Sequence, residues 1–208
     1  MTQSNDCDTA LFAAVQAGEL AKASDALAAG ANVNAANSYK VTPLLEAAGE
    51  GHLEMARLLI ESGAEINYTG MSEGSPLTLV AFMGNVEFLR LFLEAGANVN
   101  LAMPAGGETA LHMAAVASQT AAAKVLLDAG ANPNLHAKSG VATSMFDGSV
   151  KLWGETPLHY AAAYGDEEMI QAMLLAGANR EARNTHGETP LAYAGRHHRP
   201  RNIRDLLK

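Results

Sequence analysis

The sequence predicts an all-α solenoid, a stack of short helix-turn-helix units. Two observations lead to this prediction. A phrase close to Gly-Ala-Asn-x-Asn begins at residues 30, 96 and 130, with weaker copies at residues 63 and 177. Apolar blocks that open with Thr or Ser return at spacings of 33, 33, 34, 47 and 33 residues. The opening residues are Thr9, Thr42, Ser75, Thr109, Thr156 and Thr189. A period of about 20 to 50 residues is typical of solenoids and other repeat arrays.

The first helix of each unit is predicted from its opening residues. In the second unit, Thr42 is a candidate N-cap, because its hydroxyl can accept a hydrogen bond from a backbone N–H that has no partner within the helix. Pro43 follows at the first helical position, where a missing N–H removes no helical hydrogen bond. Ala47 and Ala48 allow close packing against neighbouring helices, and Gly51 is placed to end the helix.

The second helix of each unit is predicted from an apolar stripe. In the second unit the stripe consists of Leu53, Ala56, Leu59 and Ile60, spaced to lie on one helix face. Gly63 follows this helix at a position where a left-handed conformation suits glycine. A single pair of short helices cannot bury its apolar face alone, so we expect each unit to be stabilised by stacking on its neighbours.

The repeated unit resembles the ankyrin repeat. Its clearest copy, residues 156–165, reads TPLHYAAAYG, which is close to the signature phrase of that family. The period of 33 residues is the family's own, and recognisable copies cover nearly the whole chain. The resemblance implies paired antiparallel helices with a loop or β-hairpin, here called a finger, projecting from each junction. It also implies a concave surface of fingers and first helices that binds other proteins.

On this basis we expect a single ankyrin repeat domain over residues 1–208, with six units of which the first and last are caps. The expected units are residues 4–36, 37–69, 70–103, 104–136, 154–183 and 184–208, with an inserted hairpin at residues 137–153. The resemblance further implies that His112 and His159 bridge backbone groups of neighbouring units, and that His52 has a similar structural role.

Three residues depart from the family pattern. Phe12 stands at the family's His position in the first unit. Ser118 stands where the glycine between the two helices normally lies, so we expect the helices of the fourth unit to meet through a slightly different turn. The last unit lacks the His and places Pro200 between its helices.

The spacing of 47 residues between Thr109 and Thr156 indicates that about 14 residues have been added to the period of 33. Asp147-Gly148 is a strong signal for a two-residue hairpin turn, and β-favouring residues flank it on both sides. We interpret the insertion as an elongated finger, because growing a surface loop costs little closure entropy. It either contacts a partner or folds back over the apolar side of a neighbouring unit.

Composition narrows the classes of function. The net charge is −8, and residues 1–100 carry 12 acidic against 4 basic side chains. General nucleic-acid binding is therefore not expected, since it requires a basic face. Cys7 is the one cysteine, and no apolar run reaches the length of a membrane span. We expect a monomeric cytoplasmic protein, although a leader removed ahead of residue 1 would leave no trace in this sequence.

The sequence contains no arrangement typical of an enzyme or a metal site. It has no cysteine pair or His-x-x-x-His spacing for zinc and no Gly-x-Ser-x-Gly elbow for a nucleophile. The glycines of residues 70–76 lack the lysine of a phosphate-binding loop. Acidic residues 166–168 fall at the start of a predicted helix, where they complement its dipole. We expect no catalytic activity and no cofactor or metal.

We expect a protein partner, whose identity the sequence does not reveal, to contact the finger tips and the ends of the first helices. The expected contact residues are Tyr39, Glu50, Met71, Phe82, Met83, Val116, Met145, Phe146, Leu152, Trp153, Tyr164, His186, Arg196 and His197. The apolar members would form a band rimmed by Glu50, Glu108 and Glu155. Such a protein would act as an adaptor or scaffold, or as an inhibitor of a cognate enzyme.

Two alternatives stay open at this stage. The hairpin near residues 140–155 and Tyr164 could frame a pocket for a small ligand. The basic run RHHRPR at residues 196–201 could contact an acidic partner or nucleic acid, although a solvated C-terminal cap is the favoured interpretation of that run.

Overall fold

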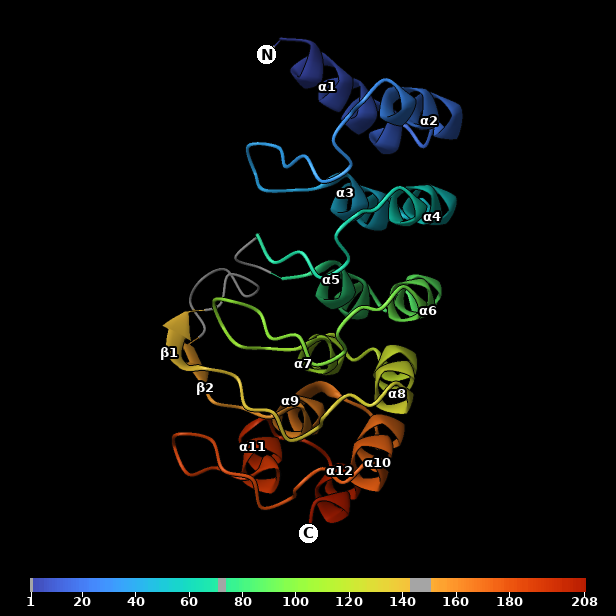
Figure 1. The fold of residues 1–208 in the computed structure, drawn as a ribbon. Coiled ribbons are helices and arrows are strands. Elements are labelled where there is room, and N and C mark those ends of the chain that lie inside the picture. The colour runs from blue at the N-terminus through green and yellow to red at the C-terminus, as the bar shows by residue number, and fades with distance from the viewer. Residues whose placement is uncertain (1, 71–73, 143–150) are drawn as a thin grey trace.

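Among the residues that the structure describes, twelve helices in six consecutive pairs dominate the fold (Figure 1). The structure is a computed structural model and describes residues 2–70, 74–142 and 151–208. The helices are α1 (Thr2–Gln16), α2 (Leu20–Ala28), α3 (Pro43–Glu50), α4 (Leu53–Glu61), α5 (Pro76–Met83), α6 (Val86–Glu94), α7 (Ala110–Val116), α8 (Thr120–Asp128), α9 (Pro157–Tyr164), α10 (Glu167–Leu175), α11 (Pro190–Arg196) and α12 (Arg201–Leu206). The predicted all-α solenoid is confirmed.

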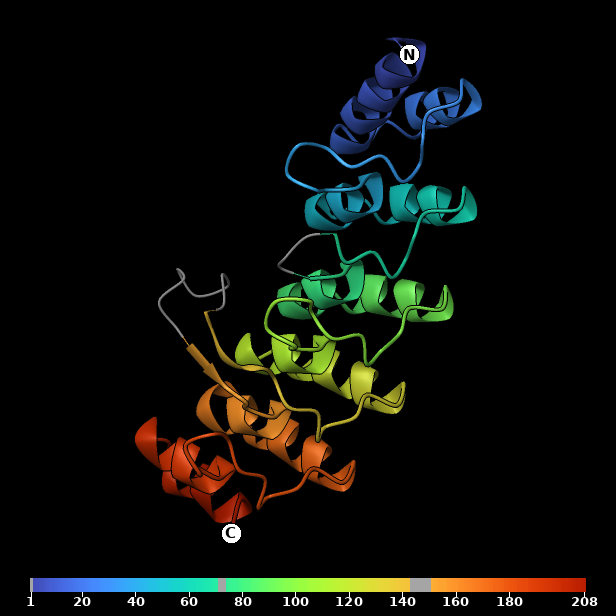
Figure 2. The ribbon, with the colours of Figure 1, turned by 60° about the vertical axis from the view of Figure 1, so that its left-hand side comes forward.

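The helices form two layers. The first helices of the pairs contact one another in the order α1, α3, α5, α7, α9 and α11, and the second helices do so in the order α2, α4, α6, α8, α10 and α12. Figure 1 shows these layers as two columns, with the fingers projecting from the column of first helices. The N- and C-termini lie at opposite ends of the stack (Figures 1 and 2).

Short polar side chains begin the first helices, as the sequence predicts. The Thr42 hydroxyl accepts a hydrogen bond from the Leu45 amide, and Ser75 forms a reciprocal capping box with Thr78. In α7 the capping partner is His112, whose Nδ1 accepts a 3.0 Å hydrogen bond from the Thr109 amide. Nε2 of the same ring lies 3.3 Å from the Glu155 carbonyl of the next unit. The expected bridging role of this histidine is therefore confirmed.

The other two histidines also contact neighbouring units. His159 Nε2 lies 3.0 Å from the Glu188 carbonyl, and His52 Nε2 lies 3.4 Å from the Gln16 carbonyl. Burial lowers the pKa of His112 to about 3, so its ring stays neutral in the folded protein at physiological pH. A neutral ring can both donate and accept, which the two contacts of each bridging imidazole require.

The apolar core is one continuous spine. It extends from Leu11 in the first pair to Leu207 in the last, and the alanine pairs of the first helices are fully buried within it. Small side chains let the helices of successive units approach closely, while the buried rings of Phe88 and Phe92 on α6 pack edge to face. Because the spine crosses every junction, each unit depends on its neighbours.

The second asparagine of the repeated Gly-Ala-Asn-x-Asn phrase connects successive units. Asn100 Oδ1 accepts a hydrogen bond from the Asn132 amide at 2.8 Å, and its Nδ2 donates to the Gly130 carbonyl at 3.3 Å. Equivalent paired bonds are made by Asn34, Asn67 and Asn134. Asn134 makes its bonds across the inserted segment, so the insertion leaves the stacking register unchanged.

The turn between α7 and α8 corrects a prediction. Ser118 adopts a left-handed conformation with φ of 56°, in the same region as Gly51 at 78°. The expectation of a different turn in the fourth unit was wrong, because a serine tolerates this conformation here. Its Oγ donates a 2.6 Å hydrogen bond to the Tyr164 carbonyl.

The unusual inter-helix turn belongs instead to the fifth unit. Gly165 has φ of −73° and ψ of 169°, an extended conformation open to any residue. A side chain at this glycine would place Cβ 2.8 Å from the Ala161 carbonyl oxygen and 2.9 Å from Met169 Sδ. Close approach of the two helices, and not backbone conformation, therefore requires glycine at this position.

The insertion begins and ends as a two-stranded antiparallel sheet. Strand β1 (Ser139–Ala142) pairs with β2 (Lys151–Trp153), with Ser139 opposite Trp153. The predicted turn Asp147-Gly148 lies outside the described residues. The fingers between units 1 and 2 and between units 5 and 6 are loops without strands, closed by bonds such as Asn37 N–H to the Val41 carbonyl at 3.0 Å. Among the described helices, none combines the length and hydrophobicity needed to cross a bilayer.

The left-handed conformation of Ser118 predicts that two substitutions change the free energy of unfolding by different amounts. Ser118→Ala loses the bond to Tyr164 and keeps the strained φ, so we expect the free energy of unfolding to fall by about 1 kcal/mol. Ser118→Gly loses the same bond but relieves the strain, so its stability should lie within about 0.5 kcal/mol of the wild type. Urea denaturation followed by circular dichroism measures both, and equal losses in the two variants would show that the left-handed conformation carries no cost.

Candidate functional site

The base of the inserted hairpin is held between the fingers on either side of it. The Lys138 amide donates to the Gly106 carbonyl at 2.7 Å on the side of the fourth unit. Both the backbone amide and the hydroxyl of Thr185 donate to the Trp153 carbonyl, at 2.7 and 2.9 Å, on the side of the sixth. Three adjacent fingers are thereby joined into one surface, visible at the lower left of Figure 1.

Trp153 leads a compact group of side chains on this surface. Its ring lies 4.0 Å, centroid to centroid, from the ring of His186 on the next finger. The Arg196 guanidinium carbon lies 4.8 Å from the centroid of the Trp153 ring and 4.5 Å from that of Tyr193. We call the group the Trp153 cluster, and its members are Trp153, Tyr164, His186, Tyr193, Arg196 and His197. Tyr193 is only 6% exposed and supports the group from below.

The Trp153 cluster continues along α9 and α11. The His197 ring lies 4.9 Å from that of Tyr193 and 5.3 Å from that of Tyr164. Glu188 pairs with Arg196 at 3.2 Å and so fixes the guanidinium over the two rings. Five residues predicted from separate parts of the sequence, Trp153, Tyr164, His186, Arg196 and His197, thus come together in the structure.

The other basic side chains near the C-terminus mostly bind the protein itself. Arg199 donates to the carbonyl groups of Ala163 and Gly165, across the unusual turn of the fifth unit. Arg201 pairs with Asp205 at 3.4 Å. Arg199 is thereby engaged within the protein, which agrees with a C-terminal cap, whereas the Arg201 side chain remains 85% exposed.

Two glutamates lie buried beneath the hairpin. Glu108 and Glu155 are each only 2% exposed, so the prediction that they rim an exposed band was wrong. Both belong to the Gly-Glu-Thr phrase that precedes a first helix, and that position faces the neighbouring finger. The Glu155 carboxylate accepts a 2.8 Å hydrogen bond from the Trp153 amide and a 3.4 Å bond from the Tyr193 hydroxyl. It therefore positions two members of the Trp153 cluster.

Glu108 is electrostatically the less satisfied of the two. Among the described residues, no hydrogen-bond partner lies within reach of its buried Oε2 atom. Burial raises the pKa of the Glu108 carboxyl, and repulsion from the Glu155 carboxylate raises it further, while a backbone hydrogen bond partly opposes both effects. The ionised form of Glu108 is thus disfavoured in the folded protein.

The remaining predicted contact residues are distributed along the first-helix layer. Phe82 and Met83 at the end of α5 are 39% and 42% exposed, and Glu50 is exposed at the end of α3. Tyr39 is 81% exposed on the first finger, and Val116 is half-buried at the end of α7. None of these five joins the Trp153 cluster.

Four further predicted residues need separate mention. Leu152 is only 1% exposed, so its assignment as a contact residue was wrong. Alternation along β2 turns this side chain inward when Trp153 faces outward. Met71, Met145 and Phe146 lie outside the described residues, and their assignment stays a prediction.

Sequence reasoning missed Tyr193 and Glu188 as parts of the site, and it placed Glu155 on an exposed rim although this residue is buried beneath the site. The missed signal was the triple recurrence of Gly-Glu-Thr at residues 107–109, 154–156 and 187–189. A carboxylate repeated at one register position ahead of consecutive helices indicates a shared structural environment. The sequence around Tyr193 does not indicate its contact with Glu155, because its hydroxyl reaches this carboxylate only when the fifth and sixth units stack.

Trp153 lines none of the following three hollows, which lie among the described residues. One of about 450 Å³ lies between the first two units, one of about 490 Å³ between α8 and α10, and one of about 610 Å³ between α1 and α2. Within the same residues, no group of three or more His, Cys, Asp or Glu side chains is placed to hold a metal ion.

The fold defines a helical repeat protein of stacked helix pairs, with fingers that project from the layer of first helices. Comparison with known sequences gives the family. The family described as ankyrin repeats (3 copies) matches residues 1–70, 67–137 and 135–208. The chain therefore belongs to the ankyrin repeat family, whose domains are typically non-catalytic modules that mediate protein–protein interaction.

Individual relatives agree with this assignment. Rabankyrin-5 from Homo sapiens and from Mus musculus is each 49% identical to this chain over 41 residues, which is 20% of this chain and 4% of each relative. The crystal structure of an ankyrin repeat domain from Acinetobacter baumannii AYE superimposes with a TM-score of 0.78 and 27% sequence identity. That alignment covers 95% of both chains, so the likeness extends over the whole stack.

The buried Glu108 yields a prediction about stability and pH. Glu108→Gln removes the disfavoured charge, so we expect it to raise the free energy of unfolding at pH 7 by about 1 kcal/mol. A raised pKa means that the folded state binds the proton more tightly than the unfolded state. The advantage of the variant is therefore present above the folded pKa and shrinks as the pH falls toward the ordinary value of 4.5.

Urea titrations of both proteins between about pH 7 and pH 4.5 measure this difference. Burial lowers the pKa of the bridging histidines, so their effect on stability has the opposite pH dependence to that of Glu108. This effect is the same in both proteins and cancels when the two free energies of unfolding are subtracted. Glu94→Gln, at an exposed position on α6, serves as the matched control and should change stability little at any pH in this range. A Glu108→Gln advantage that persists unchanged at pH 4.5 would contradict the assignment of its cause to ionisation.

Proposed function

We propose that this protein is a non-catalytic recognition module that binds a protein partner, as a monomer, through the finger side of its last three units. The Trp153 cluster carries the proposal. Trp, Tyr and Arg are the residue types most enriched at the energetic centres of protein interfaces, and here they are grouped on one face. Aromatics make up only 5% of the chain, so their convergence on this face is a specific feature.

Preorganisation of the Trp153 cluster supports the proposal. The Trp153 backbone is bound on one side by Thr185 and on the other by the buried Glu155 carboxylate. Glu188 fixes Arg196 at 3.2 Å, and the two rings beneath the guanidinium restrict it further. Side chains that are ordered before binding lose little conformational entropy on binding, so more of the contact energy contributes to affinity.

Exposed apolar side chains extend the proposed contact surface toward the N-terminus. Tyr164 on α9 is 38% exposed, and the exposed ends of α5 add Phe82 and Met83. These helices are joined through α7 in the first-helix layer, so a partner that covers the Trp153 cluster can reach all of them. An extended surface of this kind suits an adaptor, and a hairpin that projects from it suits an inhibitor that blocks an active site.

The proposal predicts a separation between binding and folding. Trp153→Ala should weaken binding of the partner about 10- to 100-fold, because a centrally placed Trp contributes roughly 2 kcal/mol or more. Arg196→Gln, which removes the cation but keeps the length of the side chain, should weaken binding by a smaller factor. A partner captured from native lysate and then purified provides the binding assay by calorimetry, and helical circular dichroism at 222 nm reports the fold.

Leu175→Ala provides the control for these variants. Leu175 is 90% exposed at the end of α10, in the layer of second helices, so its removal changes apolar surface far from the proposed contact. Its affinity for the partner should equal that of the wild type. If Trp153→Ala binds as tightly as Leu175→Ala, the proposed contact surface is wrong. If it instead melts far earlier, the aromatic group has a structural role.

A further inference from the structure

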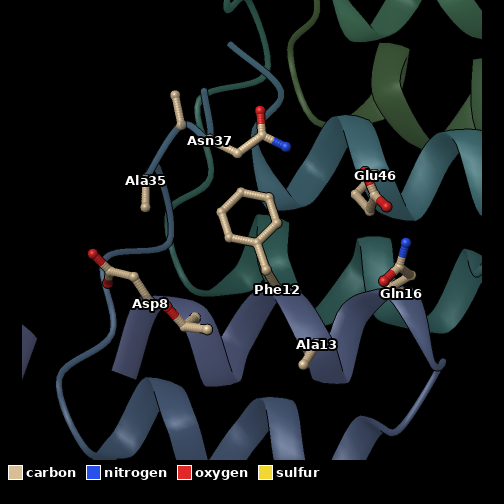
Figure 3. Close-up of a pocket in the computed structure, with 9 residues that line it drawn as sticks. Asp8, Phe12, Ala13, Gln16, Ala35, Asn37 and Glu46 are labelled. Carbon is tan, nitrogen blue, oxygen red and sulfur yellow. The ribbon is translucent and has the colours of Figure 1, made fainter. Parts of the chain in front are cut away.

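A second surface, at the opposite end of the stack, differs in chemistry from the Trp153 cluster. A hollow of about 450 Å³ opens between α1, the finger of residues 35–41 and the start of α3. Its polar and aromatic lining consists of Asp8, Thr9, Phe12, Gln16, Asn37 and Glu46. Figure 3 shows the Phe12 ring rising into the middle of this space, with Asp8 on one side and Glu46 and Gln16 on the other. We call it the Phe12 pocket.

Phe12 occupies the register position at which the fourth and fifth units place a bridging histidine and at which the other units carry Leu45, Thr78 and Ala192. His112 and His159 are fully buried and contact the next unit, whereas Phe12 is only half-buried. A phenyl ring cannot form the hydrogen bonds of the bridging histidines, so the junction between the first two units lacks that contact. The substitution leaves an aromatic face directed into an open hollow.

The polar groups around the ring are held in place. Asp8 Oδ1 accepts a 2.7 Å hydrogen bond from the Asn32 amide. Asn37 Oδ1 accepts bonds from the amides of Tyr39 and Val41 at 2.9 and 3.1 Å, which fixes the finger that forms the upper wall. The ion pairs found among the described residues include neither Asp8 nor Glu46, so both carboxylates lack a cationic partner there.

Charge around the Phe12 pocket has one dominant sign. Residues 1–70 contain 9 Asp and Glu against 3 Lys and Arg, a difference of −6. Two of those three cations, Lys22 and Arg57, are each paired with the glutamate three residues before them, and the third, Lys40, lies on the finger of residues 35–41. The pocket therefore presents an aromatic face and two carboxylates in a negative field, a combination that favours a cation and disfavours an acidic group.

We propose that the Phe12 pocket binds an arginine side chain presented by the protein partner. This inference rests on the proposed function as a protein-recognition module and adds the chemistry of one contact. A guanidinium is planar, so it can stack on the Phe12 ring while its N–H groups donate to Asp8 and Glu46. A lysine ammonium is a compact charge that cannot stack and reach both carboxylates with the same geometry.

The probe for this proposal is the peptide acetyl-Gly-Ser-Gly-Arg-Gly-Ser-Gly-amide, titrated into the full chain and followed by nitrogen-15 NMR. We expect shifts of the backbone amides of residues 8–16 and 35–46 and a dissociation constant of about 1 mM. Matched peptides carry citrulline, lysine or glutamate in place of arginine. Citrulline has the same shape without the charge and should bind at least about threefold more weakly, and glutamate should not bind.

Variants of the protein identify the pocket as the place of binding. Phe12→Leu keeps apolar bulk but removes the ring, and Glu46→Gln removes one carboxylate. Each variant should bind the arginine peptide about two- to fivefold more weakly than the wild type, as expected for the loss of a cation–π contact or of an exposed ion pair. Glu61→Gln removes one charge from the second-helix layer of the same unit and should have no effect. Thermal melts confirm that each variant stays folded.

Several outcomes would overturn the inference. These are shifts outside the named residues, equal binding of the arginine and citrulline peptides, or unchanged binding to Phe12→Leu and Glu46→Gln. Lysine binding as tight as arginine binding overturns the choice of a guanidinium. Failure here is distinguishable from failure of the proposed function, because the Trp153→Ala test uses the captured partner and a different end of the stack. A partner that depends on Trp153 but not on Phe12 refutes the arginine pocket alone.

Discussion

Every feature of this protein depends on contact between consecutive units. The described helices are 6 to 15 residues long, and isolated helices of such length are marginal at best in water. Stability must come from the spine that crosses all the junctions and from polar groups that pair between units. The asparagine at the end of the first four repeated phrases is the clearest case, since both the oxygen and the nitrogen of its side-chain amide form hydrogen bonds with the following unit. The sequence repeats because the interface repeats.

The polar contacts between units are not uniform along the stack. The last three units add bridging histidines, buried glutamates and tyrosines to the asparagine contacts. This network ties the base of the inserted hairpin to the fingers on both sides, which keeps the Trp153 cluster in one arrangement. The junction of the first two units has the His52 contact with the Gln16 carbonyl instead, and Phe12 lines a hollow at the register position of His112 and His159. The stack is thus most tightly coupled where the largest finger must be supported.

This asymmetry gives the finger side of the stack two chemically different ends. Near the C-terminus, aromatic rings and a paired guanidinium form a surface suited to a large, partly apolar contact. Near the N-terminus, carboxylates surround a single exposed ring. A partner that spans the fingers would meet both, and the difference in charge between the ends would fix the direction in which it lies. Buried Glu108 belongs to neither end, and its burial is a local cost of building the hairpin into the stack.

The sequence by itself determined the fold, the family and the position of the insertion. Period, caps and apolar stripes are local patterns, and each unit repeats them, so errors at single residues such as Ser118 leave the architecture intact. Only the tertiary structure decided which side chains form the surface. Leu152 and the glutamates at 108 and 155 looked exposed in the linear pattern, yet neighbouring fingers cover them. Tyr193 and Glu188 join Trp153 because stacking brings distant segments together, and the linear order of residues carries no record of that proximity.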